Sequence, residues 1–113
     1  MIYVSHPYGG KEENKQKIEQ IIKVYSQRYN GEVFISPVHS FGFMYDCLDY
    51  ERGMELCLEL LDRCDSMLVF GDYKSSRGCG IEVQFAIDNN IPYQIVGDIV
   101  PIVTGKQIGR AHV

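Results

Sequence analysis

The stretch SMLVFGDYKSSRGCGIEVQFAIDNNIPYQIV, residues 66–96, holds two short apolar segments separated by a longer amphipathic one. Residues 66–71 and 91–96 have the length and apolar character of buried strands. Between them, residues 72–78 predict a loop and residues 79–89 predict a helix. A strand, a helix and a second strand in this order predict a βαβ unit, whose two strands run parallel.

The first half of the chain shows the same alternation. Residues 1–5 predict a buried strand, and residues 12–29 predict a helix because their apolar side chains recur at helical spacing. Those side chains are Ile18, Ile21, Ile22 and Tyr25. Residues 32–36 predict a second strand that Pro37 ends.

The middle of the chain predicts a long loop over residues 37–49 and a helix over residues 50–63. The whole order is strand and helix in alternation, which predicts an α/β fold. We expect a flavodoxin- or Rossmann-like three-layer sandwich, with a mainly parallel sheet of four or five strands and helices on both faces. A fifth short strand is expected around residues 99–103, within one domain that spans residues 1–113 and whose tail, residues 104–113, can be disordered.

Length and composition restrict the classes of function. The chain has 113 residues, 45% of them hydrophobic, and a formal net charge of −4, which suits one compact domain. The acidic balance argues against a nucleic-acid polymer as partner, although a few backbone amides can still hold one free nucleotide. No apolar run approaches the roughly 20 residues of a membrane helix, and the N-terminus lacks the pattern of a signal peptide, so a cytoplasmic protein is expected.

The four cysteines do not form a metal or redox motif. Cys47, Cys57, Cys64 and Cys79 contain no CxxC pair, so we expect buried free thiols and neither a zinc site nor another metal. The chain also lacks a Walker A loop and a GxGxxG fingerprint, so no ATPase or dinucleotide site is indicated. No cofactor is expected.

Parallel α/β sheets bind ligands beyond the carboxyl ends of their strands. This rule selects the loops at residues 5–11, 36–42 and 71–80, which hold most of the unusual residues of the chain. The first loop offers hydrogen-bonding side chains and a glycine pair that lets the backbone approach a ligand. Its candidate binding residues are Ser5, His6, Tyr8, Gly9 and Gly10, and the second loop adds His39.

The third loop contains SSRGCGIE, residues 75–82. Gly78 and Gly80 allow close approach where a helix begins, and the free amides there, with Ser76, suit an anion. Glu82 has two interpretations. It can perform chemistry at the strand ends, or it can cap the helix from the first turn, which is the commoner role of such a glutamate.

Taken together, these motifs resemble the nucleoside 2-deoxyribosyltransferase superfamily, which includes the deoxynucleoside 5′-monophosphate N-glycosidases. The similarity is closest to a small branch found in bacteria and phages. It covers residues 1–97 through YVSHPYGG, ISPVH, LLDRCDSMLVFG, the pattern S-x-G-x-G-x-E over residues 76–82, Ala86 and NNIPYQIV. It implies one nucleoside 2-deoxyribosyltransferase-like domain.

The resemblance also implies roles for individual residues. Glu82 would be the nucleophile that attacks C1′ of a (deoxy)ribosyl group, and water or a second base would then take the sugar. Ser76 and the glycine turns would hold a 5′-phosphate, with Ser5 and the pair Gly9-Gly10 lining the same pocket. Either Tyr3 or Tyr8 would supply a hydroxyl near Glu82. Hydrolysis and transfer both stay open, as do the base and the sugar.

One position departs from the pattern of the superfamily. Members carry an aspartate eight residues before the Asp of the "CD" pair, and it assists proton transfer to the leaving base; here that position is Cys57. A thiol is a poor substitute, because its pKa of about 8.5 rises further in apolar surroundings. Candidate stand-ins are Asp46, Asp49 and Glu55, although a helix places Glu55 away from the Cys57 face.

Three hypotheses follow. The first is an N-glycosidase or (deoxy)ribosyltransferase that acts on a nucleoside or nucleoside 5′-monophosphate. The second is a nucleotide-binding module that senses or sequesters its ligand without efficient chemistry. The third is an interaction domain, suggested by the aromatic segment FGFMYDCLDY, residues 41–50, which we interpret as a homo-oligomer contact that also closes the pocket.

Overall fold

The computed structural model describes residues 1–98, and the expected fifth strand and tail lie outside these residues. The strands are β1 (Ile2–Ser5), β2 (Phe34–Ile35), β3 (Ser66–Phe70) and β4 (Tyr93–Gly97). The helices are α1 (Glu12–Arg28), α2 (Pro37–Phe41), α3 (Tyr50–Asp62) and α4 (Arg77–Asp88), with two short 3₁₀ turns, η1 (Gly42–Met44) and η2 (Tyr73–Ser75). Each strand and helix expected within residues 1–98 is present.

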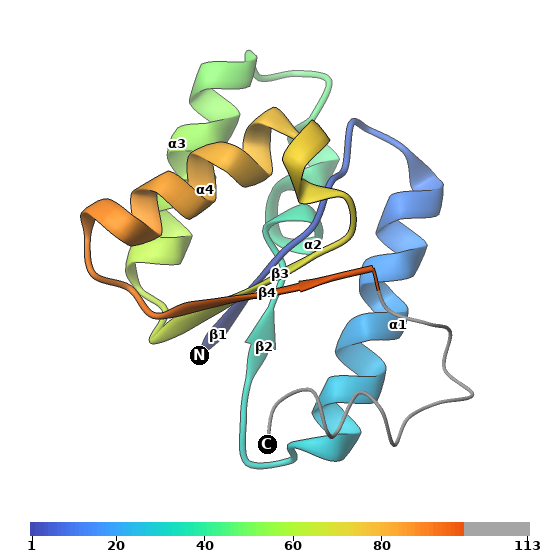
Figure 1. Cartoon of the computed structure of the whole chain (residues 1–113). Coiled ribbons are helices and arrows are strands. Elements are labelled where there is room, and N and C mark those ends of the chain that lie inside the picture. Colours follow the sequence, from blue (N-terminus) through green and yellow to red (C-terminus); the bar gives the residue numbers. More distant parts are fainter. Residues whose placement is uncertain (99–113) are drawn as a thin grey trace.

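The four strands form one parallel sheet in the order β2-β1-β3-β4. Figure 1 shows α1 on one side of this sheet and both α3 and α4 on the other. The fold is therefore the α/β three-layer sandwich that the alternating pattern predicts. The order also locates the topological switch point, since the chain leaves β1 toward β2 and later returns to β3 on the opposite side of β1.

The two faces of the sheet bury separate apolar clusters. Val4 and Phe70 pack with Ile18, Ile21 and Tyr25 from α1. On the other face, the cluster against α3 and α4 consists of Tyr3, Leu61, Cys64, Met67, Val69 and Ala86. Because side chains alternate along a strand, Tyr3 and Ser5 point to the face opposite Val4, toward the layer that contains α3 and α4.

The long loop expected over residues 37–49 is wrong in part, because α2 and η1 lie within it. Pro37 is the first residue of α2, a position where its missing amide costs no helical hydrogen bond. The preceding Ser36 caps the helix, since its hydroxyl accepts from the His39 amide at 3.3 Å. The sequence interpretation took Pro37 as the end of a strand and did not consider that it also begins a helix.

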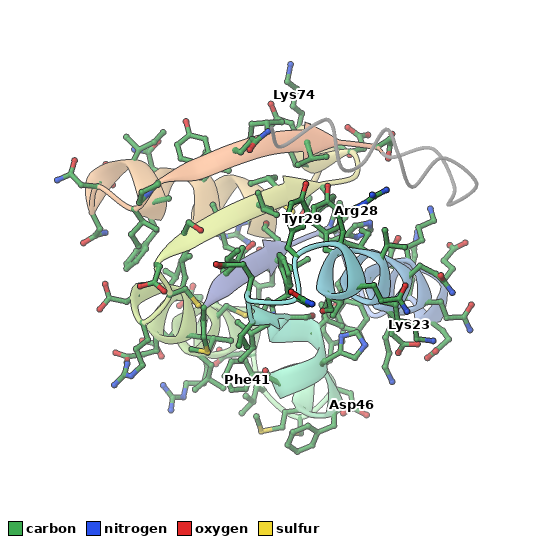
Figure 2. The ribbon with its side chains drawn as sticks, turned by 90° about the horizontal axis from the view of Figure 1, so that it is seen from below. Lys23, Arg28, Tyr29, Phe41, Asp46 and Lys74 are labelled. Carbon is green, nitrogen blue, oxygen red and sulfur yellow. The ribbon has the colours of Figure 1, made fainter. Side chains whose placement is uncertain are left out.

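Figure 2, which views the molecule from below, shows Phe41 and Asp46 together on the α2 side of the molecule, whereas Lys74 projects from the opposite side, beyond β4. The segment after α2 exposes two aromatic side chains, Phe43 at 80% and Tyr45 at 52%. Within residues 1–98, no helix is long and apolar enough to cross a membrane.

The cysteines are free thiols, but they are not all buried as expected. Cys64 and Cys79 are buried, Cys57 is half-buried and Cys47 is exposed. Cys47 lies in the exposed segment between η1 and α3, where no apolar layer covers it.

Candidate functional site

A pocket of about 590 Å³ lies at the carboxyl ends of β1 and β3. The loop after β1 contributes His6, Tyr8 and Gly9 to its lining, and the start of α4 contributes Ser76 and Gly78. Side chains from α2, η1 and α3 complete the wall. The pocket thus occupies the switch point of the sheet, where open α/β folds bind their ligands.

Glu82 lines this pocket from α4 and is only 5% exposed. It shares the inward face of that helix with Cys79 and Ala86, three residues before it and four after it. A carboxylate therefore occupies a position at which helical spacing calls for an apolar side chain. Buried carboxylates are rare in cores unless they are paired or functional.

The capping interpretation of Glu82 is wrong. The helix begins at Arg77, two residues earlier than expected, so Glu82 is its sixth residue and lies beyond the first turn. Ser76 performs the capping instead, since its hydroxyl accepts from the Cys79 amide at 3.2 Å. The glutamate side chain is directed to the sheet.

Two hydroxyl groups from β1 hold the carboxylate. Ser5 Oγ donates to Glu82 Oε1 at 2.7 Å, and Tyr3 Oη donates to Glu82 Oε2. Both donors are completely buried. Because Tyr3 and Ser5 are two residues apart on one strand, they point to the same face and reach both oxygens of one carboxylate. Of the two tyrosines considered from the sequence, Tyr3 is the one that contacts Glu82.

Burial raises the pKa of Glu82 to about 7, although the hydrogen bonds from Tyr3 and Ser5 act in the opposite direction. Burial and the charge of Glu82 also raise the pKa of Tyr3 well above its usual value. Near neutral pH the carboxyl group therefore exchanges its proton readily, while Tyr3 stays protonated as a donor. Groups perturbed in this way inside a pocket are candidates for function.

Cys57 extends the same cluster from α3. Cys57 lines the pocket, and it lies close enough to Tyr3 for each to influence the pKa of the other. Burial, with the nearby charge of Glu82, raises the pKa of Cys57 to about 12. The thiol is therefore neutral at physiological pH and is neither a good nucleophile nor a well-matched acid.

The family model described as Domain of unknown function (DUF7768) matches residues 1–96. The chain belongs to this family. The match includes all of β1 to β3 and α1 to α4, and with them every residue of the pocket. No curated protein matches the chain.

In this DUF7768 domain, the structure brings most of the expected site residues together. His6, Tyr8, Gly9, Ser76, Gly78 and Glu82 line one pocket, and Ser5 contacts Glu82 from below the surface. The pair Gly9-Gly10 adopts positive φ angles of 61° and 74°, which glycine alone accommodates without strain. A Cβ at Gly10 would lie 2.8 Å from the Tyr45 ring, so this glycine lets the aromatic side chain pack closely.

Besides Ser5, three of the expected residues, Gly10, His39 and Gly80, do not line the pocket of the DUF7768 domain. His39 does not line the pocket; its Nε2 lies 2.9 Å from Glu19 Oε2, and its Nδ1 lies 3.1 Å from Ser36 Oγ. The contact with Glu19 ties α2 to α1, and the contact with Ser36 lies within α2 and its cap. Gly80 is exposed on α4, and a Cβ there would meet no atom within 4 Å. A helix turns 100° per residue, so Gly80 and Gly78 cannot share one face.

The serines of the third loop are already engaged in local hydrogen bonds. Ser75 Oγ donates to Asp72 Oδ2 at 2.7 Å, and Ser76 caps α4. The amides of Arg77 and Gly78 precede the first helical hydrogen bond, which the Gly80 amide donates to Ser76. Among the described residues these two amides have no acceptor, so backbone donors are better placed than the serines to hold an anion.

The sequence interpretation missed several pocket residues of the DUF7768 domain. They are Lys11, Asn14, Met54 and Arg77, whereas Tyr45 and Tyr50 belong to the segment that was expected to close the pocket. The guanidinium of Arg77 lies over the Tyr50 ring, 4.6 Å from its centroid, which joins the starts of α3 and α4. Arg77 stands inside SSRGCGIE and was detectable there, but Met54 is distant in sequence and belonged to an ordinary amphipathic pattern.

The described residues provide no metal centre. No three His, Cys, Asp or Glu side chains in residues 1–98 are arranged to hold a metal ion.

Proposed function

We propose that this domain cleaves an N-glycosidic bond, or transfers a (deoxy)ribosyl group, with Glu82 as the nucleophile. One observation carries the proposal: a buried carboxylate lines a pocket at the switch point, and two buried hydroxyls hold both of its oxygens. The motifs that resemble the nucleoside 2-deoxyribosyltransferase superfamily support the same assignment of Glu82.

The mechanism uses the ionised carboxylate. A Glu82 oxygen attacks C1′ of the sugar, the bond from C1′ to the base nitrogen breaks, and the base takes the bonding electrons. Water then cleaves the glycosyl ester, or a second base accepts the sugar. Because the pKa of Glu82 is about 7, a large fraction of the carboxyl groups is ionised at neutral pH. Tyr3 and Ser5 fix the direction from which it attacks.

The preferred substrate in this proposal is a nucleoside 5′-monophosphate. Arg77 and Gly78, whose amides have no acceptor among the described residues, line the pocket, and so does the cationic residue Lys11. Amides at a helix N-terminus and a nearby guanidinium are the usual ligands of a phosphate group. Hydrolysis of the monophosphate is therefore favoured over exchange between free nucleosides.

A second candidate function is a binding module that holds a nucleotide-derived ligand without efficient turnover. It is favoured by Cys57, which occupies the wall next to Tyr3 where a stronger acid would assist the leaving base. In this case a ligand would raise the melting temperature of the domain and stay intact.

We also propose that two copies of the chain associate through the segment after α2. Phe43 is 80% exposed there, and Tyr45 both lines the pocket and packs edge-on against Tyr8, with ring centroids 5.1 Å apart. A second copy on this segment would cover Phe43 and narrow the pocket entrance. The expected partners are thus a nucleotide and a second copy of the chain.

The test of the enzymatic proposal is a panel of nucleosides and their 5′-monophosphates, with free base measured by chromatography. We expect Glu82→Gln to lower base release at least about 100-fold, because the amide is a much weaker nucleophile. The matched control is Glu59→Gln, an exposed glutamate of α3 that pairs with Arg63 at 2.6 Å and lies outside the pocket lining. Equal rates for wild type and Glu82→Gln would refute the enzymatic proposal.

A further inference from the structure

The groups that face Glu82 differ from those of an acid-assisted site. Within residues 1–98, the groups whose raised pKa has the charge of Glu82 among its causes are Tyr3, Tyr50, Cys57 and Cys79, all of them hydroxyls or thiols. No Lys, Arg or His contributes to the shift of its pKa, which burial, Tyr3 and Ser5 determine. The carboxylate is therefore buried without a cationic partner.

This arrangement limits which base can leave. The base of a neutral nucleoside departs as an anion unless an acid protonates it, and an efficient acid needs a pKa near the working pH. Burial raises the pKa of Cys57 to about 12, and the pKa of Tyr3 lies well above its ordinary value of 10, so both are poor acids. The groups around Glu82 therefore provide little help to an anionic leaving base.

Two further ionisable side chains of the pocket lining, Asp49 and His6, are engaged in other contacts. Asp49 Oδ1 accepts from the Arg52 amide at 2.7 Å and caps α3. The His6 ring packs against Gly71, where a Cβ would lie 3.1 Å from Nε2, and its Nδ1 lies 2.7 Å from the Pro7 carbonyl oxygen. Neither side chain is among those that influence Glu82.

A cationic leaving ring satisfies both conditions. It brings the positive charge that the buried carboxylate lacks, and this attraction is stronger in a buried site than in water. It also departs as a neutral molecule, so no proton has to be supplied. Tyr8 and Tyr45, which pack edge-on against each other, both line the pocket, and the face of an aromatic ring attracts a flat cation.

We propose that the substrate of this site is an N-glycoside of a quaternary pyridinium ring, of the kind found in nicotinamide riboside and its 5′-monophosphate. This inference rests on the function proposed above and names its substrate class. The phosphate of the monophosphate would meet the free amides of Arg77 and Gly78, while the pyridinium ring would lie beside Glu82.

The chemical step balances without a cofactor. A Glu82 oxygen forms a bond to C1′, and the bond between C1′ and the pyridinium nitrogen breaks. The bonding pair moves to that nitrogen, which neutralises the ring and releases neutral nicotinamide. Water then attacks the glycosyl ester, which yields the free sugar phosphate, the Glu82 carboxylate and one proton to solvent.

The wild-type chain gives the first test. Nicotinamide mononucleotide is compared with adenosine, cytidine and thymidine 5′-monophosphates in their ribose and deoxyribose forms, with Glu82→Gln alongside. We expect kcat/KM for the pyridinium compound to be at least about tenfold higher than kcat/KM for each neutral compound. In Glu82→Gln, kcat/KM for the pyridinium compound should fall at least about 100-fold. Comparable or faster Glu82-dependent cleavage of a neutral monophosphate would overturn this inference and leave the proposed function standing. Absence of Glu82-dependent cleavage for all compounds would overturn both.

A second test asks whether the missing acid sets this preference. Cys57→Asp places a carboxyl group next to Tyr3, with Cys57→Ser as the control of similar size. General acid catalysis contributes typically 10²–10⁴-fold, so we expect the ratio of neutral to pyridinium cleavage to rise at least about tenfold in Cys57→Asp only. An unchanged ratio in a Cys57→Asp protein that retains its melting temperature would contradict the inference; if that variant does not fold, the wild-type panel decides.

Discussion

At the scale of the residue, the burial of Glu82 has a structural cost, and we propose a chemical role for the same carboxylate. Its neighbours on the inward face of α4, Cys79 and Ala86, are buried side chains that fit a core. A carboxylate on the same face of the helix loses most of its hydration. The hydrogen bonds from two hydroxyls compensate for only part of that loss, as the rise of the pKa of Glu82 to about 7 indicates. Natural sequences tolerate such local conflicts mainly at functional sites.

This cost predicts how stability changes with pH. The pKa of Glu82 is about 7 in the folded chain and near 4.5 when exposed, so the unfolded chain releases its proton first as pH rises. Below about pH 4.5 the carboxyl group is protonated in both states, so its ionisation does not change the free energy of unfolding. Between about pH 4.5 and 7 its ionisation in the unfolded chain lowers the free energy of unfolding by an amount that grows to roughly 3 kcal/mol. The free energy of unfolding of Glu82→Gln, relative to wild type, should increase by that amount over the same range.

Urea denaturation of both proteins at several pH values measures this difference, since other titrating groups contribute equally to both. Glu59→Gln serves as the control and should track the wild type, because its carboxylate is exposed and its ion pair with Arg63 is a surface one. A constant difference between Glu82→Gln and wild type across this range would show that the carboxyl group titrates at its ordinary pKa.

At the scale of the element, the motif SSRGCGIE at the start of α4 contains both a helix cap and backbone amides without an acceptor. Ser76 satisfies the Cys79 amide as the helix cap, which leaves the Arg77 and Gly78 amides open. A Cβ at Gly78 would lie 3.4 Å from the Tyr50 hydroxyl, an ordinary contact, so α4 begins directly beside α3 at the pocket wall. The cap secures the helix, and the remaining amides can bind an anion.

Substitutions at Ser76 separate these tasks. Ser76→Ala should lower the free energy of unfolding by roughly 1 kcal/mol, because the Cys79 amide loses its acceptor. Ser76→Asp keeps an acceptor at the cap and should retain stability within about 0.5 kcal/mol, but its charge should repel a 5′-phosphate at the adjacent amides.

Thermal unfolding with and without a nucleoside 5′-monophosphate measures both effects. We expect the monophosphate to stabilise wild type and Ser76→Ala, and to stabilise Ser76→Asp much less, whereas the unphosphorylated nucleoside should not distinguish the variants. Equal stabilisation of Ser76→Asp and wild type by the monophosphate would place the phosphate elsewhere.

At the scale of the whole molecule, the strand order β2-β1-β3-β4 creates the site. Tyr3 and Ser5 lie on β1, and Glu82 lies on α4. Glu82 is 79 residues from Tyr3 and 77 residues from Ser5 along the chain, and the fold brings the three side chains into contact. Figure 1 shows α3 and α4 side by side over the face of the sheet to which Tyr3 and Ser5 point. Figure 2 shows Phe41 on the side of the molecule that carries α2, next to the segment that we expect to meet a second copy.

The proposed association predicts a concentration-dependent dimer in sedimentation experiments. Phe43→Ser should raise the dimer dissociation constant at least about tenfold, because a large aromatic side chain at the centre of an interface contributes most of its energy. The control is Val33→Ser, since Val33 is 60% exposed and lies before β2, apart from the aromatic segment. A wild-type chain that sediments as a monomer at high concentration would contradict the proposal.

Much of the fold was predictable because its signals are local. Apolar runs bounded by turn residues mark β1, β3 and β4, and helical spacing marks α1 and α3. The helix α2 was not predictable, because a proline after a strand is compatible both with the end of that strand and with the start of a helix. The loops that hold the site were also predictable, because parallel sheets bind ligands at one edge.

The roles of individual side chains were less accessible. His39 lies in one of the loops that the sequence selects for the site, but its side chain contacts Glu19 and Ser36 and does not line the pocket. Met54 lies in an ordinary helical pattern and becomes a pocket residue only through the packing of α3 against α4.

The sequence by itself determined the order of strands and helices along the chain, the edge of the sheet that holds the pocket and the presence of Glu82 there. These follow from the periodicity of neighbouring residues. Only the tertiary structure decided that Glu82 is buried against Tyr3 and Ser5 rather than capping α4, and that Cys57 lies beside them without a cation. Burial and long-range hydrogen bonds set the pKa of a carboxyl group, and both arise when β1, α3 and α4 pack together.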